Sequence, residues 1–224
     1  DTEINTDVWN YDLADGCAVG LCGWGNNELE YYRQDTTNIK LKNGKLVITA
    51  TLDGGTYYSG RINTKNNFTI TFGRIDIRAR LPKGQGIWPA LWLLGSNIDQ
   101  NPWPACGEID LMEMRGQEPD RVQGTVHYNN GGYVTNTGFY VLDQSDFTEQ
   151  YHVFSLVWDQ NKISWYVDNE NYKNFSNSGI AGWPFNNPFY FLMNLAVGGK
   201  YLGNPDQSTT FPQEMSVDYI RVFQ

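Results

Sequence analysis

The stretch Arg-Ile-Asp-Ile-Arg-Ala-Arg-Leu at residues 74–81 alternates strictly between charged and apolar side chains. Successive side chains of a β-strand point to opposite faces of its sheet. The stretch therefore predicts a strand whose isoleucine, alanine and leucine side chains face a core, while its arginine and aspartate side chains face solvent. Such one-sided burial is typical of antiparallel sheets.

Short runs of this kind, rich in β-branched and aromatic residues, recur along the chain. We expect further strands at Lys45–Thr51, Trp88–Leu94, His152–Trp158, Ile163–Val167, Phe189–Val197 and Ser216–Phe223. Residues 159–162 would join two of these strands as a hairpin connection. Glycine and proline interrupt the sequence too often for long helices, and the helical period of 3.6 residues is almost missing. The fold class is therefore all-β, as a sandwich or barrel.

Length and composition narrow the function. The 224 residues contain no repeat or linker and fit one β domain over residues 1–224. A formal net charge of −9 argues against nucleic acid and anionic membrane as partners. No apolar run approaches the length of a membrane span, so we expect no membrane insertion. The 8 Trp, 14 Tyr and 11 Phe exceed what a core of this size needs, and exposed rings suit the apolar faces of sugars.

The three cysteines do not form a disulfide framework. Cys17 and Cys22 lie close enough in a glycine-rich segment for one local disulfide, which would suit an oxidising compartment. Cys106 is left over and is expected to be a small packing residue. The sequence shows no signal peptide, so the chain would be either cytosolic or a processed mature product.

Residues 108–113, Glu-Ile-Asp-Leu-Met-Glu, place three carboxylates in what otherwise reads as a buried strand. Glu108 and Asp110 share one face by alternation, but strict alternation would send Glu113 into the core, where a bare charge is very costly. A β-bulge around Leu111 or Met112 would return Glu113 to the face of the other two acids. The burial cost therefore predicts a bulge.

This spacing suggests a reaction. Four regular strand steps cover about 13 Å, and two glutamates leaning toward each other would bring their carboxyl groups to roughly 5 Å, which suits double-displacement glycoside hydrolysis. One glutamate must be ionised to attack the sugar, and the other must hold a proton. The alternatives are a solvated acidic strand edge and a calcium site.

Several segments beyond the acidic strand match one enzyme family. They are residues 23–29, 59–61, 88–92, 103–104, 107–113, 124–127, 194–199 and 211–224. On these segments the chain resembles glycoside hydrolase family 16, in particular its laminarinase-like endo-1,3-β-glucanases. The resemblance implies a jelly-roll (concanavalin A-like) sandwich of two curved antiparallel sheets with a concave substrate cleft, and hydrolysis with retention of anomeric configuration.

The resemblance also assigns roles by motif position. Glu108 looks like the nucleophile, Glu113 like the general acid/base, and Asp110 like the helper that hydrogen-bonds the nucleophile. Residues expected to contact the polysaccharide are Asn27, Arg61, Trp88, Trp92, Trp103, His127 and Asn194. Trp158, Trp165 and Trp183 are assigned to packing. No cofactor is expected for catalysis.

The chain departs from the family pattern at its first strand and at Glu30. The family's usual first strand is not found at the start of this sequence, so the domain is expected to lack it or to differ there. The carbonyl of Gly44 and the side chain of Asp218 match two of the family's calcium ligands, which leaves a weak structural calcium site as an expectation. Glu30 stands where a glutamine is common.

The sequence thus favours a monomeric retaining endo-1,3-β-glucanase, with mixed 1,3-1,4 glucan as a second substrate. One alternative is a related hydrolase of marine galactans, of the agarase, carrageenase or porphyranase type. Another is a β-glucan-binding module without activity, and transglycosylation is a further outcome of a covalent intermediate. Because a polymeric glucan does not enter a cell intact, we expect the protein to be secreted or displayed at the cell surface, with its signal peptide removed.

Overall fold

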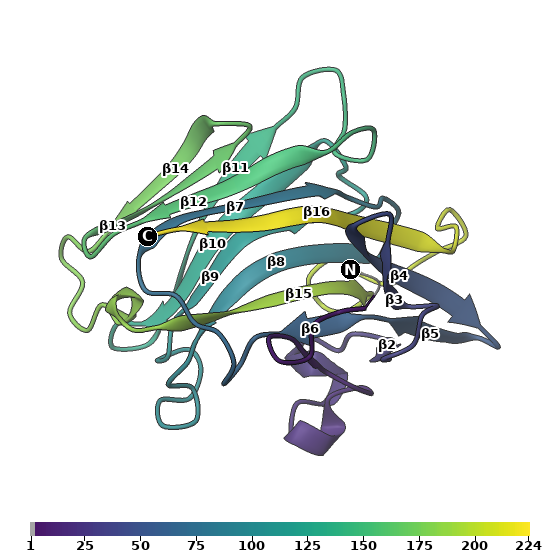
Figure 1. Ribbon diagram of the computed structural model, residues 1–224, viewed down its shortest axis with the longest axis horizontal. Coiled ribbons are helices and arrows are strands. Elements are labelled where there is room, and N and C mark those ends of the chain that lie inside the picture. The colour runs from purple at the N-terminus through teal and green to yellow at the C-terminus, as the bar shows by residue number, and fades with distance from the viewer. Residues whose placement is uncertain (1–2) are drawn as a thin grey trace.

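The computed structural model describes residues 3–224, which fold into two β-sheets stacked face to face (Figure 1). The first sheet has, in spatial order, β1 (Asn10–Tyr11), β6 (Arg61–Asn63), β15 (Phe189–Val197), β8 (Ile87–Gly95), β9 (Glu108–Met114), β10 (Arg121–Asn129) and β11 (Tyr133–Val141). The second has β14 (Glu170–Ser176), β13 (Lys162–Val167), β12 (His152–Trp158), β7 (Gly73–Arg80), β16 (Gln213–Phe223), β4 (Lys45–Asp53), β5 (Thr56–Ser59) and β2 (Glu30–Tyr32), while β3 (Ile39–Lys42) pairs with β4.

The all-β jelly-roll prediction is confirmed. Each strand expected from the sequence is present, with ends shifted by a few residues at most. Residues 159–162 form the expected hairpin connection, since Trp158 pairs with Ile163 across it. One detail differs from a wholly antiparallel arrangement: β2 runs parallel to β5, with Tyr31 opposite Tyr58.

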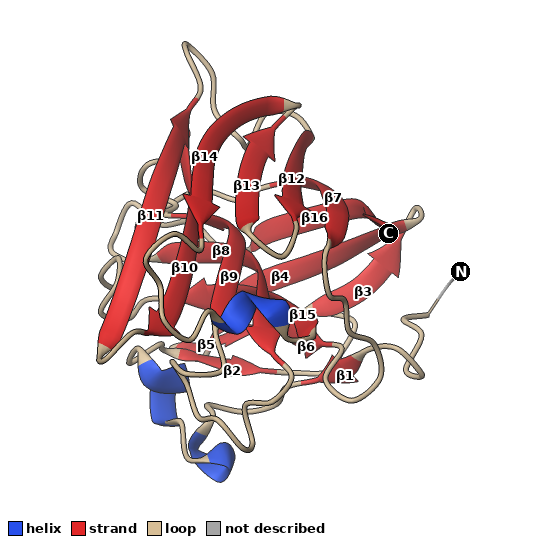
Figure 2. Ribbon diagram, turned by 90° about the vertical axis from the view of Figure 1, so that its left-hand side faces the viewer, coloured by secondary structure: helices blue, strands red, loops and turns tan. Residues whose placement is uncertain are grey.

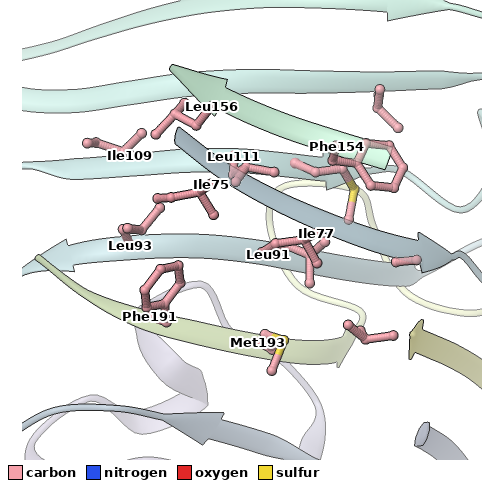
Figure 3. Close-up of a cluster of buried hydrophobic side chains, with 14 of the residues drawn as sticks. Ile75, Ile77, Leu91, Leu93, Ile109, Leu111, Phe154, Leu156, Phe191 and Met193 are labelled. Atoms are coloured by element: carbon pink, nitrogen blue, oxygen red, sulfur yellow. The ribbon is translucent and has the colours of Figure 1, made fainter. Parts of the chain in front are cut away.

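The core lies between the two sheets (Figure 3). Side chains of β7 and β12, such as Ile75 and Leu156, face those of β8, β9 and β15, such as Leu93, Ile109 and Phe191. Each of these five side chains is at most 2% exposed. The burial of Ile75 confirms the inward face predicted from the alternation at residues 74–81. Burial of a side chain of this size contributes about 1.5–3 kcal/mol. The packed layer gives β9 a rigid support on its inner face.

A glycine-rich loop precedes β2 and lies beside the end of β15. It contains the short 3₁₀ helices Cys17–Val19 and Cys22–Gly25, which project from one end of the molecule (Figure 2, blue, lower edge). The predicted disulfide between Cys17 and Cys22 is present. The loop is joined to the sheet by the Leu29 N–H, which donates to the Val197 carbonyl oxygen at 2.8 Å. A third 3₁₀ helix, Pro184–Asn186, precedes β15.

Within residues 3–224, no helix is long and apolar enough to cross a membrane.

Candidate active site

Strand β9 contains the predicted bulge. On the β8 side, Trp92 lies opposite Asp110 and Leu91 opposite Met112, so Leu111 is the extra residue. The pairing with β10 is shifted at the same place. Leu111 and Met112 are 2% and 0% exposed and both belong to the core. Two consecutive side chains in the same core between the sheets indicate a bulged backbone, and the next residue, Glu113, then returns to the outer face.

The bulge is supported from the opposite sheet. Trp165 of β13 is fully buried, and its Nε1–H donates to the carbonyl oxygen of Asp110 at 2.8 Å. Gly124 of β10 makes room for this ring, because a Cβ atom there would lie 2.3 Å from Cδ1 of Trp165. The sequence predicted the burial of Trp165 correctly but not its hydrogen bond to the backbone of the acidic strand.

Glu108 lies at the start of β9 and is half-buried. The Nε1–H of Trp103 donates to its Oε2 at 2.7 Å, and carboxylate oxygens of Glu108 and Asp110 lie within 4.8 Å of each other. His127 of β10 lies opposite Glu108 in the strand pairing, with its Nε2 3.0 Å from Oδ2 of Asp110. Glu108 is therefore oriented by a neutral donor, beside a second acid whose charge raises its pKa.

Glu113 is 7% exposed and is held by two neutral donors. The Nε1–H of Trp88 donates to its Oε1 at 3.1 Å, and the side-chain amide of Gln123 donates to its Oε2 at 2.9 Å. Gln123 was missed in the sequence, although alternation back from His127 along β10 places both residues on the same face.

Burial raises the pKa values of all three acids, and the charge of a neighbouring acid raises those of Glu108 and Asp110 further. For Glu108 the causes are desolvation and then the charge of Asp110, and for Asp110 they are desolvation and then the charge of Glu113. The pKa of Glu113 is also raised by desolvation, against the lowering effect of the Gln123 hydrogen bond. A cluster of this kind retains protons at a pH where isolated carboxyl groups have lost them. It can therefore present an ionised acid and a protonated acid together.

A second group of predicted sugar-binding residues lies on the neighbouring strands β6, β8 and β15. The guanidinium of Arg61 is 5.1 Å from the ring centroid of Trp92 and 4.3 Å from that of Trp24. The Nε1–H of Trp92 donates to Oδ1 of Asn194 at 2.8 Å. Asn27, in contrast, is an exposed loop residue with a φ of 59°. Arg61, Trp92 and Asn194 thus form one connected cluster, whereas within residues 3–224 Asn27 makes no hydrogen bond or ring contact with it.

Glu30 lies behind this cluster and is fully buried. Its Oε2 accepts the N–H of Val197 at 2.7 Å, while its Oε1 has no hydrogen-bond partner among residues 3–224. Desolvation, followed by the charge of Glu28, raises its pKa well above the ordinary value.

The surface near Glu113 includes a small pocket of about 90 Å³ lined by Arg115, Arg121, Phe139 and Tyr201. Tyr201 also packs against the Trp88 ring, with a centroid distance of 4.6 Å. A larger hollow of about 960 Å³ lies elsewhere, between the loops 81–86, 116–119 and 206–214, and includes none of the three acids.

The predicted calcium ligands lie on the other sheet. Gly44 forms the exposed turn between β3 and β4, and Asp218 lies in β16. Both carboxylate oxygens of Asp218 already pair with basic side chains. Oδ1 lies 3.1 Å from Nζ of Lys45, and Oδ2 accepts a short hydrogen bond from Arg78. A calcium ion needs those oxygens and is repelled by both side chains. In this arrangement the two residues do not fit a calcium site.

Comparison with known proteins gives the family. The family model described as glycosyl hydrolases family 16 matches residues 21–221. The chain belongs to this family. It is therefore a glycoside hydrolase, and a cofactor is not implied for its catalysis.

Three proteins illustrate what the chain is similar to. Glucan endo-1,3-beta-glucosidase A1 of Niallia circulans is 37% identical over 100% of this chain, which spans 36% of that protein. A beta-glucanase of Rhodothermus marinus is 38% identical, with 96% of this chain and 79% of the relative covered. The laminarinase catalytic domain of Thermotoga maritima MSB8 superposes with a TM-score of 0.92 at 44% identity, covering 100% of this chain and 94% of that structure.

Proposed function

We propose that this family 16 chain is a retaining endo-1,3-β-glucanase that hydrolyses laminarin-type glucans, with mixed 1,3-1,4 glucan as a further substrate. The observation that carries the proposal is the bulged strand β9. It presents Glu108 and Glu113 on one face, each held by a tryptophan N–H. The names of the Niallia and Thermotoga relatives support the choice of a 1,3-glucan.

In the first step, Glu108 attacks the anomeric carbon of a bound glucose unit as a carboxylate. The bond from that carbon to the glycosidic oxygen breaks as the new ester bond forms, and Glu113 transfers its proton to the departing oxygen. Trp103 holds Glu108 in place by a hydrogen bond, and Asp110 lies beside it. The two tryptophan N–H groups are neutral donors, so they orient both acids without forming ion pairs.

In the second step, water replaces the enzyme ester. Glu113, now ionised, takes a proton from the water while the water oxygen bonds to the anomeric carbon. The ester bond to Glu108 breaks, and Glu108 leaves as a carboxylate. The charges of Glu108 and Glu113 repel each other. Forming the ester removes the charge of Glu108, so the pKa of Glu113 falls when it must act as a base. Two inversions give net retention.

Hydrolysis of four polymers tests the proposal: laminarin, lichenan, agarose and carrageenan. We expect new reducing ends from laminarin, fewer from lichenan and none from the galactans, with the β-anomer formed first in the NMR spectrum. Glu108→Gln should abolish release without changing the far-ultraviolet spectrum. Normal activity in that variant, or preferential cutting of a galactan, would refute the assignment.

We further propose that the protein acts as a monomer outside the cell, either secreted or at the cell surface after removal of a signal peptide. The Cys17–Cys22 disulfide supports an oxidising compartment, and the size of the substrate supports an extracellular one. Fractionation of the source cells, followed by sedimentation of the purified protein, tests both parts.

A further inference from the structure

The small polar pocket beside Glu113 has no role in the mechanism above. Glu113 itself lines one part of it. Four other side chains in its walls come from separate segments: Arg115 from the loop after β9, Arg121 from the start of β10, Phe139 from β11 and Tyr201 from the loop after β15. Its volume of about 90 Å³ has room for a few water molecules. It can therefore receive the hydroxyl groups along one edge of a sugar, but not a whole ring.

Phe139 lies on the same face of the sheet as Glu113. Gln123 of β10 is opposite Glu113 on one side and opposite Phe139 on the other, so the three side chains form a row across β9, β10 and β11. Two strand spacings separate Phe139 from Glu113, which is about 10 Å. The cluster around Arg61 lies across β9, on β6, β8 and β15. The outer face of the sheet thus offers sugar contacts on both sides of the acidic strand.

The chemistry decides which sugar unit meets this pocket. Glu113 gives its proton to the glycosidic oxygen, and the glucose unit beyond that oxygen departs. Glu108 attacks the anomeric carbon from the side opposite this oxygen, so the departing unit lies next to Glu113 and away from Glu108. The pocket has the same placement, because it adjoins Glu113 near the end of β9 whereas Glu108 is the first residue of the strand.

The walls of the pocket suit a neutral sugar. Phe139 is 47% exposed, and its ring is held by the guanidinium of Arg121, 3.8 Å from the ring centroid. Such a ring can pack against the C–H face of glucose. Glu118 pairs with both arginines, at 3.3 Å from Arg121 and 3.8 Å from Arg115. Each guanidinium has five N–H donors, so donors remain for sugar hydroxyl groups.

We propose that this pocket and the Phe139 ring bind the glucose unit that departs in the first step, and that an acceptor sugar bound there competes with water in the second. The inference rests on the proposed function, since it adds a binding site for the same reaction. In transfer, an acceptor hydroxyl gives its proton to Glu113 while its oxygen bonds to the anomeric carbon. The ester bond breaks, and Glu108 leaves as a carboxylate.

A purely structural role is the alternative, in which the ion pairs of Glu118 only stabilise the connection between β9 and β10. Two substrates separate the roles. Laminarihexaose must place departing glucose units beyond Glu113, whereas laminaribiosyl β-fluoride releases only fluoride and leaves the pocket empty. Phe139→Ala should lower kcat/KM for the hexaose by about tenfold, the size of one aromatic contact, and change that for the fluoride by less than about twofold. A structural role predicts equal losses.

The competition between acceptor and water gives a second readout. With laminaribiosyl β-fluoride as donor and a low concentration of laminaribiose as acceptor, fluoride release counts all turnovers and the tetrasaccharide counts transfers. Phe139→Ala and Arg121→Gln should each lower the tetrasaccharide formed per fluoride by about tenfold. Fluoride release without acceptor should stay at the wild-type rate, because ester formation from this donor does not use the pocket.

Phe223→Ala provides the matched control. This phenylalanine is 51% exposed and ends β16 in the other sheet, so its loss should leave both readouts at wild-type values. Thermal midpoints of all variants check that they are folded. Equal losses on the two substrates in Phe139→Ala, or wild-type values in both assays, would overturn the inference while laminarin hydrolysis by the wild type stays normal. Failure of the wild type to cut laminarin would instead refute the proposed function.

Discussion

Substituting Trp165 by phenylalanine tests whether the opposite sheet holds the catalytic strand in place. The change removes the N–H that donates to the Asp110 carbonyl oxygen at 2.8 Å, at a position that is fully buried. Leaving a buried carbonyl without its donor costs about 1–3 kcal/mol. The smaller ring leaves a void of a few tens of Å³, which adds about 1 kcal/mol. Together these losses predict a thermal midpoint lower by roughly 5–15 °C for a chain of this length.

Trp158 provides a matched control for this experiment. It lies in the neighbouring strand β12, is 2% exposed, and donates its Nε1–H to the Phe185 carbonyl oxygen at 2.9 Å. Trp158→Phe therefore loses a similar ring and a similar hydrogen bond, but away from β9. Both variants should lose stability to a similar extent, measured by thermal and urea denaturation.

Only Trp165→Phe should impair catalysis when kcat on laminarin is measured well below both midpoints. The carbonyl that Trp165 binds belongs to Asp110, one residue before the bulge. Loss of this hydrogen bond lets Asp110 and Glu113 move relative to Glu108. A misplacement of 1 Å at reacting groups can cost about a hundredfold in rate. The reasoning is refuted if the two variants have the same kcat, or if Trp165→Phe keeps wild-type stability.

Three further predictions use other contacts. Gln123→Leu removes the hydrogen bond that lowers the pKa of Glu113, so this pKa should rise further. The basic limb of the kcat/KM profile should then move to higher pH, and an unchanged basic limb would contradict this reasoning. Glu30 has a raised folded-state pKa, so its contribution to the free energy of unfolding falls as pH rises above the ordinary carboxyl range. Glutamine does not titrate, so the free energy of unfolding of Glu30→Gln relative to wild type should grow between about pH 4 and about pH 8 in urea titrations. A constant or reversed difference would show that the buried carboxyl is not the cause. Because Lys45 and Arg78 bind both oxygens of Asp218, neither calcium nor a chelator should shift the thermal midpoint by more than about 1 °C, and a larger calcium-dependent rise would reveal a site.

The sequence was sufficient for features that depend on local pattern and burial. The alternation at residues 74–81 predicted β7 and its inner face, and the cost of burying Glu113 predicted the bulge in β9. Both inferences use only the two-residue period of a strand and the penalty for an unpaired buried charge. The roles assigned to the acids and to the sugar-binding residues stay predictions until variants are measured.

Features that depend on which strands become neighbours could not be read from the sequence. Trp165 bonds a carbonyl 55 residues away in the other sheet, and nothing in the pattern of β13 marks that partner. The three charged residues at the predicted calcium position are neighbours only because the sheet places β7, β16 and β4 side by side. They are Arg78, Asp218 and Lys45. The parallel pairing of β2 with β5 has the same origin. Gln123, by contrast, could have been found by alternation from His127.

The place of β9 within its sheet separates the backbone of the reacting acids from the loops that carry other predicted sugar-binding residues. It lies in the interior of the sheet, between β8 and β10, whereas Asn27 comes from the glycine-rich loop before β2 and Trp103 from the loop before β9. Insertions or exchanges in those peripheral segments leave the backbone of the reacting acids anchored on both sides. Grafting such loops between related chains should therefore change which linkage and chain length are cut while the stereochemical course stays the same.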